Sequence, residues 1–283
     1  MILDLTGAAL RWRRRRSSWR PLREPFDPSR YFVEPLQKTA IARDFIETHH
    51  YSRSLPVALA SYGLYERVSA FQSELAGVAV FSVPIQPRAA AAYGAGDASF
   101  CDLGRFILLD NAGSNSETWF LARALRLLQA ERPANKGGPR LVIAYSDPMP
   151  RADRAGQVHF NGHMGGIYRD SSAIYVGRTK PRRLWLADDG TVLSDRALSK
   201  LRNDESGAGY AYETLLRHGA PKRNLGEDGP TYVTRALSEG PFRCMRHNGN
   251  HTYAFPLGSH ANRRDLRHKM DRNLQKPRKT DAI

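Results

Sequence analysis

The chain has 283 residues, of which 41% are hydrophobic and 10% aromatic, so it can bury a core and is not a disordered protein. Its 43 Lys and Arg against 28 Asp and Glu leave a net charge of +15, which favours an acidic partner. No apolar run approaches the roughly 18 residues that cross a bilayer, and no apolar segment typical of a secretory signal follows the N-terminal arginines. Cys101 and Cys244 are too few for a disulfide scaffold, and we expect a reduced, cytoplasmic setting.

The positive charge is concentrated at the two ends. Residues 1–24 carry seven Arg and two acidic residues, and residues 263–283 carry eight Lys and Arg and three Asp, so each end has a net charge of +5. Basic ends around a mildly basic centre are typical of nucleic-acid binding, although solubilising tails would look the same. We predict a basic N-terminal arm (1–34), one domain with a C-terminal elaboration (35–262) and a basic tail (263–283). The candidate DNA contacts are Arg11, Arg13, Arg14, Arg15, Arg16, Arg263 and Arg264.

The predicted elements begin after the arm. "PLQKTAIARDFIETHHY" places Ile41, Phe45, Ile46 and His49 on one face of a helix. "SELAGVAVFSVP" predicts a buried strand, and "DLGRFILLD" predicts a second strand after a loop of small residues. A helix over residues 116–131 follows, with an apolar side that includes Phe120 and Ala124.

The second half is less regular. "GGPRLVIAYSD" predicts a strand, and "HFNGHMGGIYRDSSAIYVGRT" predicts a glycine-rich turn or short helix followed by a strand. Beyond residue 182 the pattern loosens, apart from an amphipathic segment at "DRALSKLR" and an aromatic stretch at "NHTYAFPLG". The order helix, strand, strand, helix, strand, helix, strand indicates an α/β (α+β) protein with one mixed sheet.

The helix predicted from residue 116 begins with a capping-box pattern. Ser114 is positioned to cap it, and Glu117 to reach back to the cap. The first turn of a helix favours anions, and Arg105 on the preceding strand could hold the same anion. The candidate anion site is therefore Arg105, Ser114, Asn115 and Ser116, although many capped helices bind nothing. The segment lacks the Lys of a Walker loop and the spacing of a Rossmann fingerprint.

Two further places carry groups capable of chemistry. Asp147 ends a predicted strand, where ligands gather in open α/β sheets, and could accept a proton or bind a metal; it could also simply cap the turn before Pro148. His50 and Tyr51 end the first predicted helix, where a histidine complements the helix dipole.

Metal-ligand spacing is weak elsewhere in the chain. His159 and His163 are four residues apart, but Gly162 weakens a helix between them. Cys244, His247 and His251 lack the second close pair of a structural zinc site, and we expect no structural zinc.

A set of segments in a fixed order spans roughly residues 36 to 260: "HHYSRS", "LGRFILLD", "NSETWFLARALRLL", "VIAYSDP", "GHMGGIYRDSSAIYVGRT", "DDGTVLSDRALSKLR" and "NHTYAF". Taken in this order, these segments resemble the Mom proteins of phages, a family with a GNAT-type acyltransferase fold. The resemblance implies a GNAT-like mixed central sheet flanked by helices. It also implies an enzyme that transfers a carbamoylmethyl (methylcarbamoyl)-type group to N6 of adenine in double-stranded DNA and so protects phage DNA from restriction, in the host cytoplasm.

The resemblance also implies roles for particular residues. His50 and Tyr51 would face a flipped adenine, with His50 or Asp147 as general base. Tyr168 would return a proton to a departing thiolate, although a core tyrosine is an equal alternative. The implied cofactors are acetyl-CoA or another CoA-like donor, and a catalytic metal ion such as iron held by His50, Tyr51 and Asp147.

The loop before residue 116 departs from the GNAT pattern. The pyrophosphate loop of those enzymes reads Gln/Arg-x-x-Gly-x-Gly/Ala, and "DNAGSNSE" does not. Two alternatives therefore stay open beside DNA modification: an N-acetyltransferase acting on a protein or small-molecule amine, and a non-catalytic basic DNA-binding module.

Overall fold

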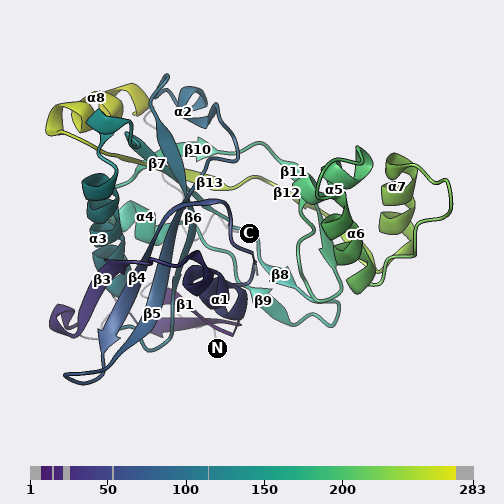
Figure 1. The fold of residues 1–283 in the computed structure, drawn as a ribbon, viewed down its shortest axis with the longest axis horizontal. Coiled ribbons are helices and arrows are strands. Elements are labelled where there is room, and N and C mark those ends of the chain that lie inside the picture. Colours follow the sequence, from purple (N-terminus) through teal and green to yellow (C-terminus); the bar gives the residue numbers. More distant parts are fainter. Residues whose placement is uncertain (1–7, 15, 22–25, 53, 114, 272–283) are drawn as a thin grey trace. The chain divides into compact units, whose positions relative to one another are not determined.

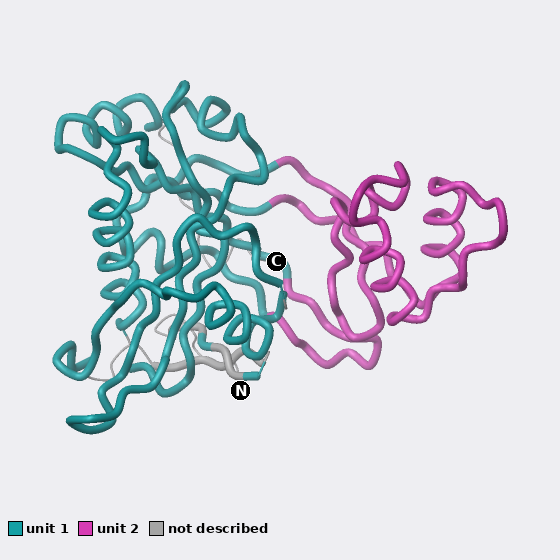
Figure 2. Tube along the Cα trace, in the orientation of Figure 1, with its two compact units in different colours: residues 1–149, 161–179, 250–283 teal, residues 150–160, 180–249 magenta. Residues whose placement is uncertain are grey.

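The computed structural model describes residues 8–14, 16–21, 26–52, 54–113 and 115–271. The chain divides into two compact units, shown in Figure 2. Unit 1 consists of residues 1–149, 161–179 and 250–283, and unit 2 consists of residues 150–160 and 180–249. No helix in the described part of the chain is long and apolar enough to cross a membrane.

Unit 1 is built on a seven-stranded mixed sheet in the order β10-β13-β7-β6-β5-β4-β3 (Figure 1). Neighbouring strands are antiparallel except for β6 and β7, which are parallel. The strands are β3 (Tyr31–Pro35), β4 (Ala58–Arg67), β5 (Ser73–Ser82), β6 (Phe100–Leu108), β7 (Leu141–Ser146), β10 (Ile174–Arg178) and β13 (His251–Pro256). The predicted mixed α/β class is confirmed, and the sheet agrees with the GNAT-like arrangement that the resemblance implied.

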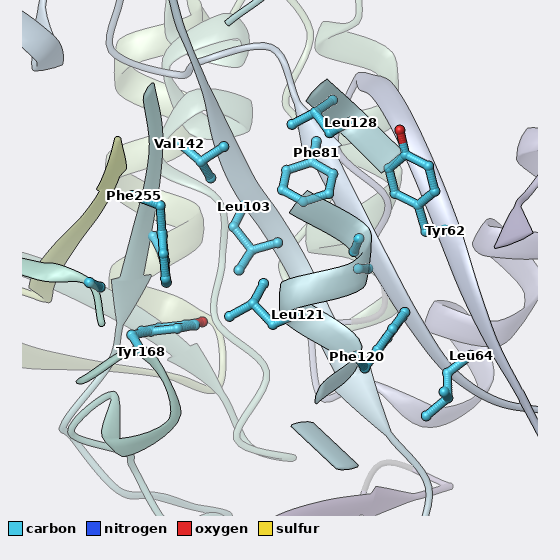
Figure 3. Close-up of a cluster of buried hydrophobic side chains, with 14 of the residues drawn as sticks. Tyr62, Leu64, Phe81, Leu103, Phe120, Leu121, Leu128, Val142, Tyr168 and Phe255 are labelled. Atoms are coloured by element: carbon cyan, nitrogen blue, oxygen red, sulfur yellow. The ribbon is translucent and has the colours of Figure 1, made fainter. Parts of the chain in front are cut away.

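Helix α3 (Ser116–Glu131) covers one face of this sheet and links β6 to the parallel strand β7. Its bounds match the predicted helix because the apolar residues Phe120, Leu121, Ala124 and Leu128 recur at helical spacing and are all buried. They pack against side chains that alternate along the strands, such as Val142 of β7 (Figure 3). This cluster is the larger core of unit 1.

The opposite face of the sheet is covered by other helices. Along β7, Leu141 and Ile143 point away from α3 and join a second cluster. Helix α8 (His260–Met270) contributes Leu266 and Met270 to this cluster, and the short helix α2 (Ala89–Ala92) lies in it as well. Part of the predicted basic tail is therefore a packed helix, because two apolar residues four positions apart anchor it to the sheet.

Helix α1 (Thr39–His49) packs against β4 and β5. Phe45 and Ile46 are buried as predicted, together with Ala42, whereas Ile41 is exposed. The predicted helical face is thus correct at its centre, and it is rotated by about one residue at its N-terminal end.

The predicted N-terminal arm contains regular structure. Strands β1 (Ala8–Arg13) and β2 (Arg16–Pro21) form an antiparallel hairpin, and β3 also begins inside this region. The two strands form a separate two-stranded sheet, and β1 lies beside β6. The sequence did not reveal these strands, because charge dominates the segment and conceals its strand pattern.

Unit 2 contains two small antiparallel strand pairs and three helices. Strands β11 (Arg182–Ala187) and β12 (Phe242–His247) pair, as do β8 (Arg151–Ala152) and β9 (Val158–Phe160). The helices are α5 (Asp195–Arg202), α6 (Ala208–Arg217) and α7 (Gly229–Glu239), and they share one apolar core. The amphipathic segment "DRALSKLR" forms α5 as predicted. The sequence did not reveal α7, because its start, "DGP", reads as a turn although Asp228 caps the helix.

Candidate functional site

The candidate site lies where β6 and β7 separate. Their backbones pair only from Phe100 and Leu141 to Asp102 and Ile143, although both strands continue beyond that point. Arg105 lies on the separated part of β6, and Asp147 directly follows β7. A parallel pair that opens in this way exposes side chains and backbone that would otherwise face a neighbouring strand.

A bulge on β6 sets the direction of Arg105. The register with β5 shifts at Gly104, and a Cβ atom at this position would lie 2.4 Å from Ser82 Oγ. A side chain does not fit there, so glycine is required, and bulges of this kind redirect the next side chain. The "LGR" sequence thus encodes a local change of direction within an otherwise regular strand.

Arg105 anchors the loop that follows α1. Its Nε and one terminal nitrogen donate to Ser54 O at 2.9 Å and to Ser54 Oγ at 3.0 Å, and the other terminal nitrogen donates to Gly104 O at 2.6 Å. Burial lowers the pKa of the guanidinium, and the neighbouring Tyr51 hydroxyl acts in the opposite direction. The predicted joint anion site of Arg105 with residues 114–116 is therefore wrong, because the side chain turns toward the α1 loop.

His50 is buried beside this arginine. Burial holds its pKa well below the ordinary value, and the positive charges of Arg105 and His163 lower the pKa further. Its Nδ1 accepts the Ser52 N–H at 3.1 Å, so the proton of the neutral ring resides on Nε2. His50 is thus a neutral donor through Nε2, which does not suit the predicted role of general base.

Tyr51 extends the site on the side of His50. The two rings are stacked at a tilt with centroids 4.3 Å apart. Tyr51 also lies close enough to Arg105 and Tyr168 to influence the pKa of both. Adjacent aromatic rings of this kind offer a face on which a planar base can stack.

Asp147 joins the same group through the loop that follows it. Its carbonyl accepts the His163 N–H at 2.7 Å, and His163 is the histidine whose charge lowers the pKa of His50. The Asp147 side chain is 7% exposed, and its Oδ1 accepts the Met149 N–H at 3.0 Å. That bond is the turn cap given above as the alternative role, and the link from Asp147 to the site runs through its backbone carbonyl and His163.

Tyr168 lies in helix α4 (Gly166–Asp170), directly after Gly165. Gly165 has a φ of +71°, and a Cβ there would lie 2.4 Å from the Tyr253 ring, so only glycine fits. The Tyr168 ring packs against Tyr253 and Phe255 in the larger core (Figure 3). Burial raises its pKa, and Tyr51 and Tyr253 raise the pKa further. Tyr168 is thus a core tyrosine that adjoins the site.

The start of α3 differs from the prediction. Ser114 lies outside the described residues, and the N-cap residue is Asn115, which has a left-handed φ of 67° and makes no capping side-chain bond. Ser116 Oγ donates back to Gly113 O at 2.6 Å. Glu117 does not reach back to the cap but pairs with Arg11 of the N-terminal hairpin. The capping-box prediction was wrong, because the partner of Glu117 is 106 residues away.

Arg11 is fully buried at this helix start. Its Nε donates to Ala112 O at 3.3 Å, and one terminal nitrogen donates to Gly113 O at 2.8 Å and to Ser116 Oγ at 3.3 Å. The other terminal nitrogen pairs with the Glu117 carboxylate. Arg11 was predicted to contact DNA, and a side chain with no exposed surface cannot do so.

The other candidate DNA contacts have different positions. Arg14 is exposed in the turn of the hairpin, and Arg263 and Arg264 are exposed on α8. Arg15 and the side chains of Arg13 and Arg16 lie outside the described part of the chain.

The implied CoA group does not fit the start of α3. A pyrophosphate there would meet the buried Glu117 carboxylate at the position that Arg11 fills. The remaining candidate anion ligands, Asn115 and Ser116, make no pocket of their own, because Ser116 is fully buried and bonded within the loop.

The structure does not support the candidate metal sites. Within the described residues, no group of three or more His, Cys, Asp or Glu side chains is arranged to hold a metal ion. His159 lies on β9 of unit 2 with its Nε2 2.8 Å from Asp153, whereas His163 belongs to unit 1. His50 Nδ1 also lies 2.8 Å from Ser52 Oγ, so only its Nε2 could take part in binding a metal.

Sequence reasoning missed two charged residues near the site. His163 was considered only as a metal ligand, although the structure links it to both Asp147 and His50. Asp102 is buried at the last position where β6 pairs with β7, and burial raises the pKa of its carboxyl group to about 6. Its Oδ2 accepts the Ile85 N–H, while its Oδ1 has no hydrogen-bond partner among the described residues. An acidic residue in the middle of an apolar strand is the signal that could have identified Asp102.

Comparison with known proteins places the chain in one family. No curated protein matches it. Among solved structures, a tandem GNAT protein from the clavulanic acid biosynthesis pathway, determined without AcCoA, is similar with a TM-score of 0.39 and 9% sequence identity, over 81% of this chain and 99% of that one. Residues 30–227 match the Mom protein family, a span that includes the site from His50 to Tyr168 but excludes Arg11. The chain belongs to the Mom protein family.

Proposed function

We propose that this protein is a DNA-modifying transferase that attaches a carbamoylmethyl-type group to the exocyclic N6 of adenine and thereby protects phage DNA from restriction. The observation that supports the proposal is that His50, Tyr51 and Arg105 lie together, with Asp147 connected to them through His163, inside the span that matches the Mom family. These residues combine an aromatic face, a neutral donor, a cation and a carboxylate.

The aromatic pair suits a base that has left its stack. A base within a duplex hides its N6 atom, so an enzyme that reacts there must extrude the nucleotide, at a cost of a few kcal/mol. Tyr51 and His50, stacked on each other, offer a platform for the extruded ring. The His50 Nε2–H can donate to a ring nitrogen of adenine, because its Nδ1 is held as an acceptor by Ser52.

Asp147 is the proposed general base. The N6 amine is a poor nucleophile because its lone pair is delocalised into the ring, so it must lose a proton as it reacts. In the proposed step N6 forms a bond to an electrophilic CH2 carbon of the donor, the N6 proton passes to the Asp147 carboxylate, and the leaving group departs with the bonding electron pair. Asp147 follows β7 and has limited access to solvent, as this role requires.

Arg105 provides the positive charge of the site. Its hydrogen-bond acceptors among the described residues are neutral oxygens of Ser54 and Gly104, so no carboxylate among them cancels its charge. Such a cation can stabilise negative charge that develops on the leaving group. Tyr168 adjoins the site on the side of the core, and we propose that its hydroxyl donates a proton to the leaving group.

Double-stranded DNA is the proposed partner. Exposed cations such as Arg14 on the hairpin and Arg263 and Arg264 on α8 can bind phosphates without reading sequence. With a net charge of +15, binding is expected to weaken steeply as salt is added.

Mass spectrometry of nucleosides tests the proposal. DNA from cells that express the protein is digested, and modified deoxyadenosine is expected with the wild type and not with Asp147→Asn. Asp44→Asn is a matched control, because Asp44 is an exposed aspartate on α1.

The other outcomes point to the alternatives. Unmodified DNA together with acetyl-CoA turnover would favour an N-acetyltransferase. DNA binding without modification by the wild type would favour a non-catalytic basic module.

A further inference from the structure

We propose that Arg11 of the β1–β2 hairpin fills the start of α3 and thereby prevents the pyrophosphate of a CoA-type donor from binding there. The anionic part of the group donor would then bind elsewhere on the protein. This inference concerns the donor side only and does not depend on what the acceptor is.

The first observation is the number of bonds that Arg11 makes. Its guanidinium donates to the carbonyls of Ala112 and Gly113 and to Ser116 Oγ, and it pairs with Glu117. These acceptors lie on the loop before α3 and on its first turn. The side chain of Arg11 has no exposed surface, so a ligand cannot approach these groups while Arg11 is in place.

The second observation concerns charge. A helix start attracts anions through its unpaired N–H groups and its dipole. Here the first turn carries a carboxylate, Glu117, whose side chain is only 5% exposed. A pyrophosphate would place further negative charge beside it in a region of low dielectric, where like charges repel strongly. Arg11 is already the counter-ion of that carboxylate.

The third observation is the path of the hairpin. On β1, the Arg11 side chain donates to Gly113 O in the loop before α3. At the turn of the hairpin, the Arg14 backbone N–H donates to His49 Nδ1 at 3.3 Å. Between these contacts β1 lies beside β6. A long cofactor that spanned from the start of α3 to His50, the next residue after His49, would have to share this path with the hairpin.

The chemistry of the loop agrees with this arrangement. Asn115 takes a left-handed conformation and caps nothing with its side chain, and the segment lacks the glycine spacing that lets a GNAT loop wrap around a pyrophosphate. The hairpin lies outside the residues that match the Mom family. The group that fills the start of α3, Arg11, therefore comes from a part of the chain that precedes the Mom match.

Hydrogen–deuterium exchange with CoA as the probe tests the inference on the full-length wild-type protein. Millimolar CoA is expected to leave the exchange of the amides of residues 115–119 unchanged. Protection of those amides by CoA in the wild type would overturn the inference. The readout involves neither DNA nor catalysis, so its failure is distinguishable from a failure of the proposed function.

A variant measures the exclusion directly. In Arg11→Ala/Glu117→Gln the ion pair is removed as a unit, and the variant is expected to bind CoA at least about tenfold more tightly than the wild type by calorimetry. Arg43→Ala, at an exposed arginine of α1, is the matched control and is expected to bind CoA as the wild type does. Equal CoA affinity in the wild type and in a folded double variant would contradict the inference. If the double variant does not fold, the exchange experiment on the wild type decides.

Discussion

Two arginines in unit 1 show how the surroundings of a cation decide its role. Arg11 lies at the start of α3 with no exposed surface and is paired with the Glu117 carboxylate. Arg105 lies on the separated part of β6 and, within the part of the chain that the structure describes, donates to neutral oxygens of Ser54 and Gly104. The charge of Arg11 is neutralised locally and contributes to the fold, whereas the charge of Arg105 still acts on its neighbours and lowers the pKa of His50.

Arg11 therefore belongs to a structural ion pair, whereas Arg105 belongs to the candidate site. Burying an ion pair is tolerated when each partner satisfies the other, and removing one partner leaves an uncompensated charge. A cation with neutral neighbours remains able to receive an anion from a ligand. We therefore expect substitutions around Arg11 to change stability first, and substitutions around Arg105 to change activity first.

The largest expected effect is on activity. Asp147→Asn is isosteric but cannot accept the N6 proton, so DNA modification is expected to fall by at least about 1000-fold. Nucleoside mass spectrometry measures the loss, and the denaturation midpoint should stay close to that of the wild type. A variant that retains full activity would remove Asp147 from the reaction.

The second effect is on stability. Glu117→Ala leaves the Arg11 guanidinium buried without its counter-ion, so the free energy of unfolding is expected to fall by about 3–5 kcal/mol. Glu117→Gln keeps a hydrogen-bond acceptor and should cost less. Chemical denaturation measures both, and a loss below about 1 kcal/mol for Glu117→Ala would contradict a buried ion pair.

Asp102 should respond to substitution in the opposite direction, because its buried carboxylate destabilises the folded protein at neutral pH. Burial raises the pKa of Asp102 from 3.8 to about 6, so the folded state binds its proton more tightly than the unfolded state does. Its contribution to stability is present below pH 3.8 and is lost as the pH rises through about 6. Asp102→Asn is therefore expected to stabilise the protein at pH 7 by up to about 3 kcal/mol. A denaturation series from pH 4 to 7 checks the sign, and a less stable variant at pH 7 would refute it.

Arg105→Lys tests whether Arg105 contributes more to activity than to stability. Lysine keeps the charge but loses the planar fork that holds Ser54, so activity is expected to fall about tenfold, or about 1.4 kcal/mol, with a smaller change in stability. Arg105→Gln, which also removes the charge, should be worse. If stability falls as much as it does in Glu117→Ala, Arg105 is as structural as Arg11.

The smallest effect concerns His50. Its pKa is depressed in the folded state, so its contribution to stability is present above 6.5, its ordinary pKa, and is lost as the pH falls below that value. NMR of the ring carbons should show a neutral His50 at pH 6, and Arg105→Gln should raise the titration midpoint, because one source of the depression is removed. A wild-type midpoint at or above 6.5 would contradict the described environment.

Much of the frame of unit 1 could be read from the sequence. The period of Phe120, Ala124 and Leu128 identified α3, and the apolar run of "GVAVF" identified β5. These patterns report local periodicity, which persists into the fold because each element must bury one face. Helices α6 and α7 of unit 2 were not predicted, because Gly209 and Pro230 in their first turns are residues typical of loops.

By itself the sequence determined the class of the fold, the main helices and strands of unit 1, and the resemblance that singled out His50, Tyr51 and Asp147. Only the tertiary structure decided that Arg11 is buried whereas Arg14 is exposed, which way Arg105 turns, and which partner Glu117 takes. The physical reason is that these outcomes depend on contacts between residues far apart in the chain, such as the 106 positions between Arg11 and Glu117. Neighbouring arginines with the same local pattern are distinguished only when another part of the chain folds against one of them.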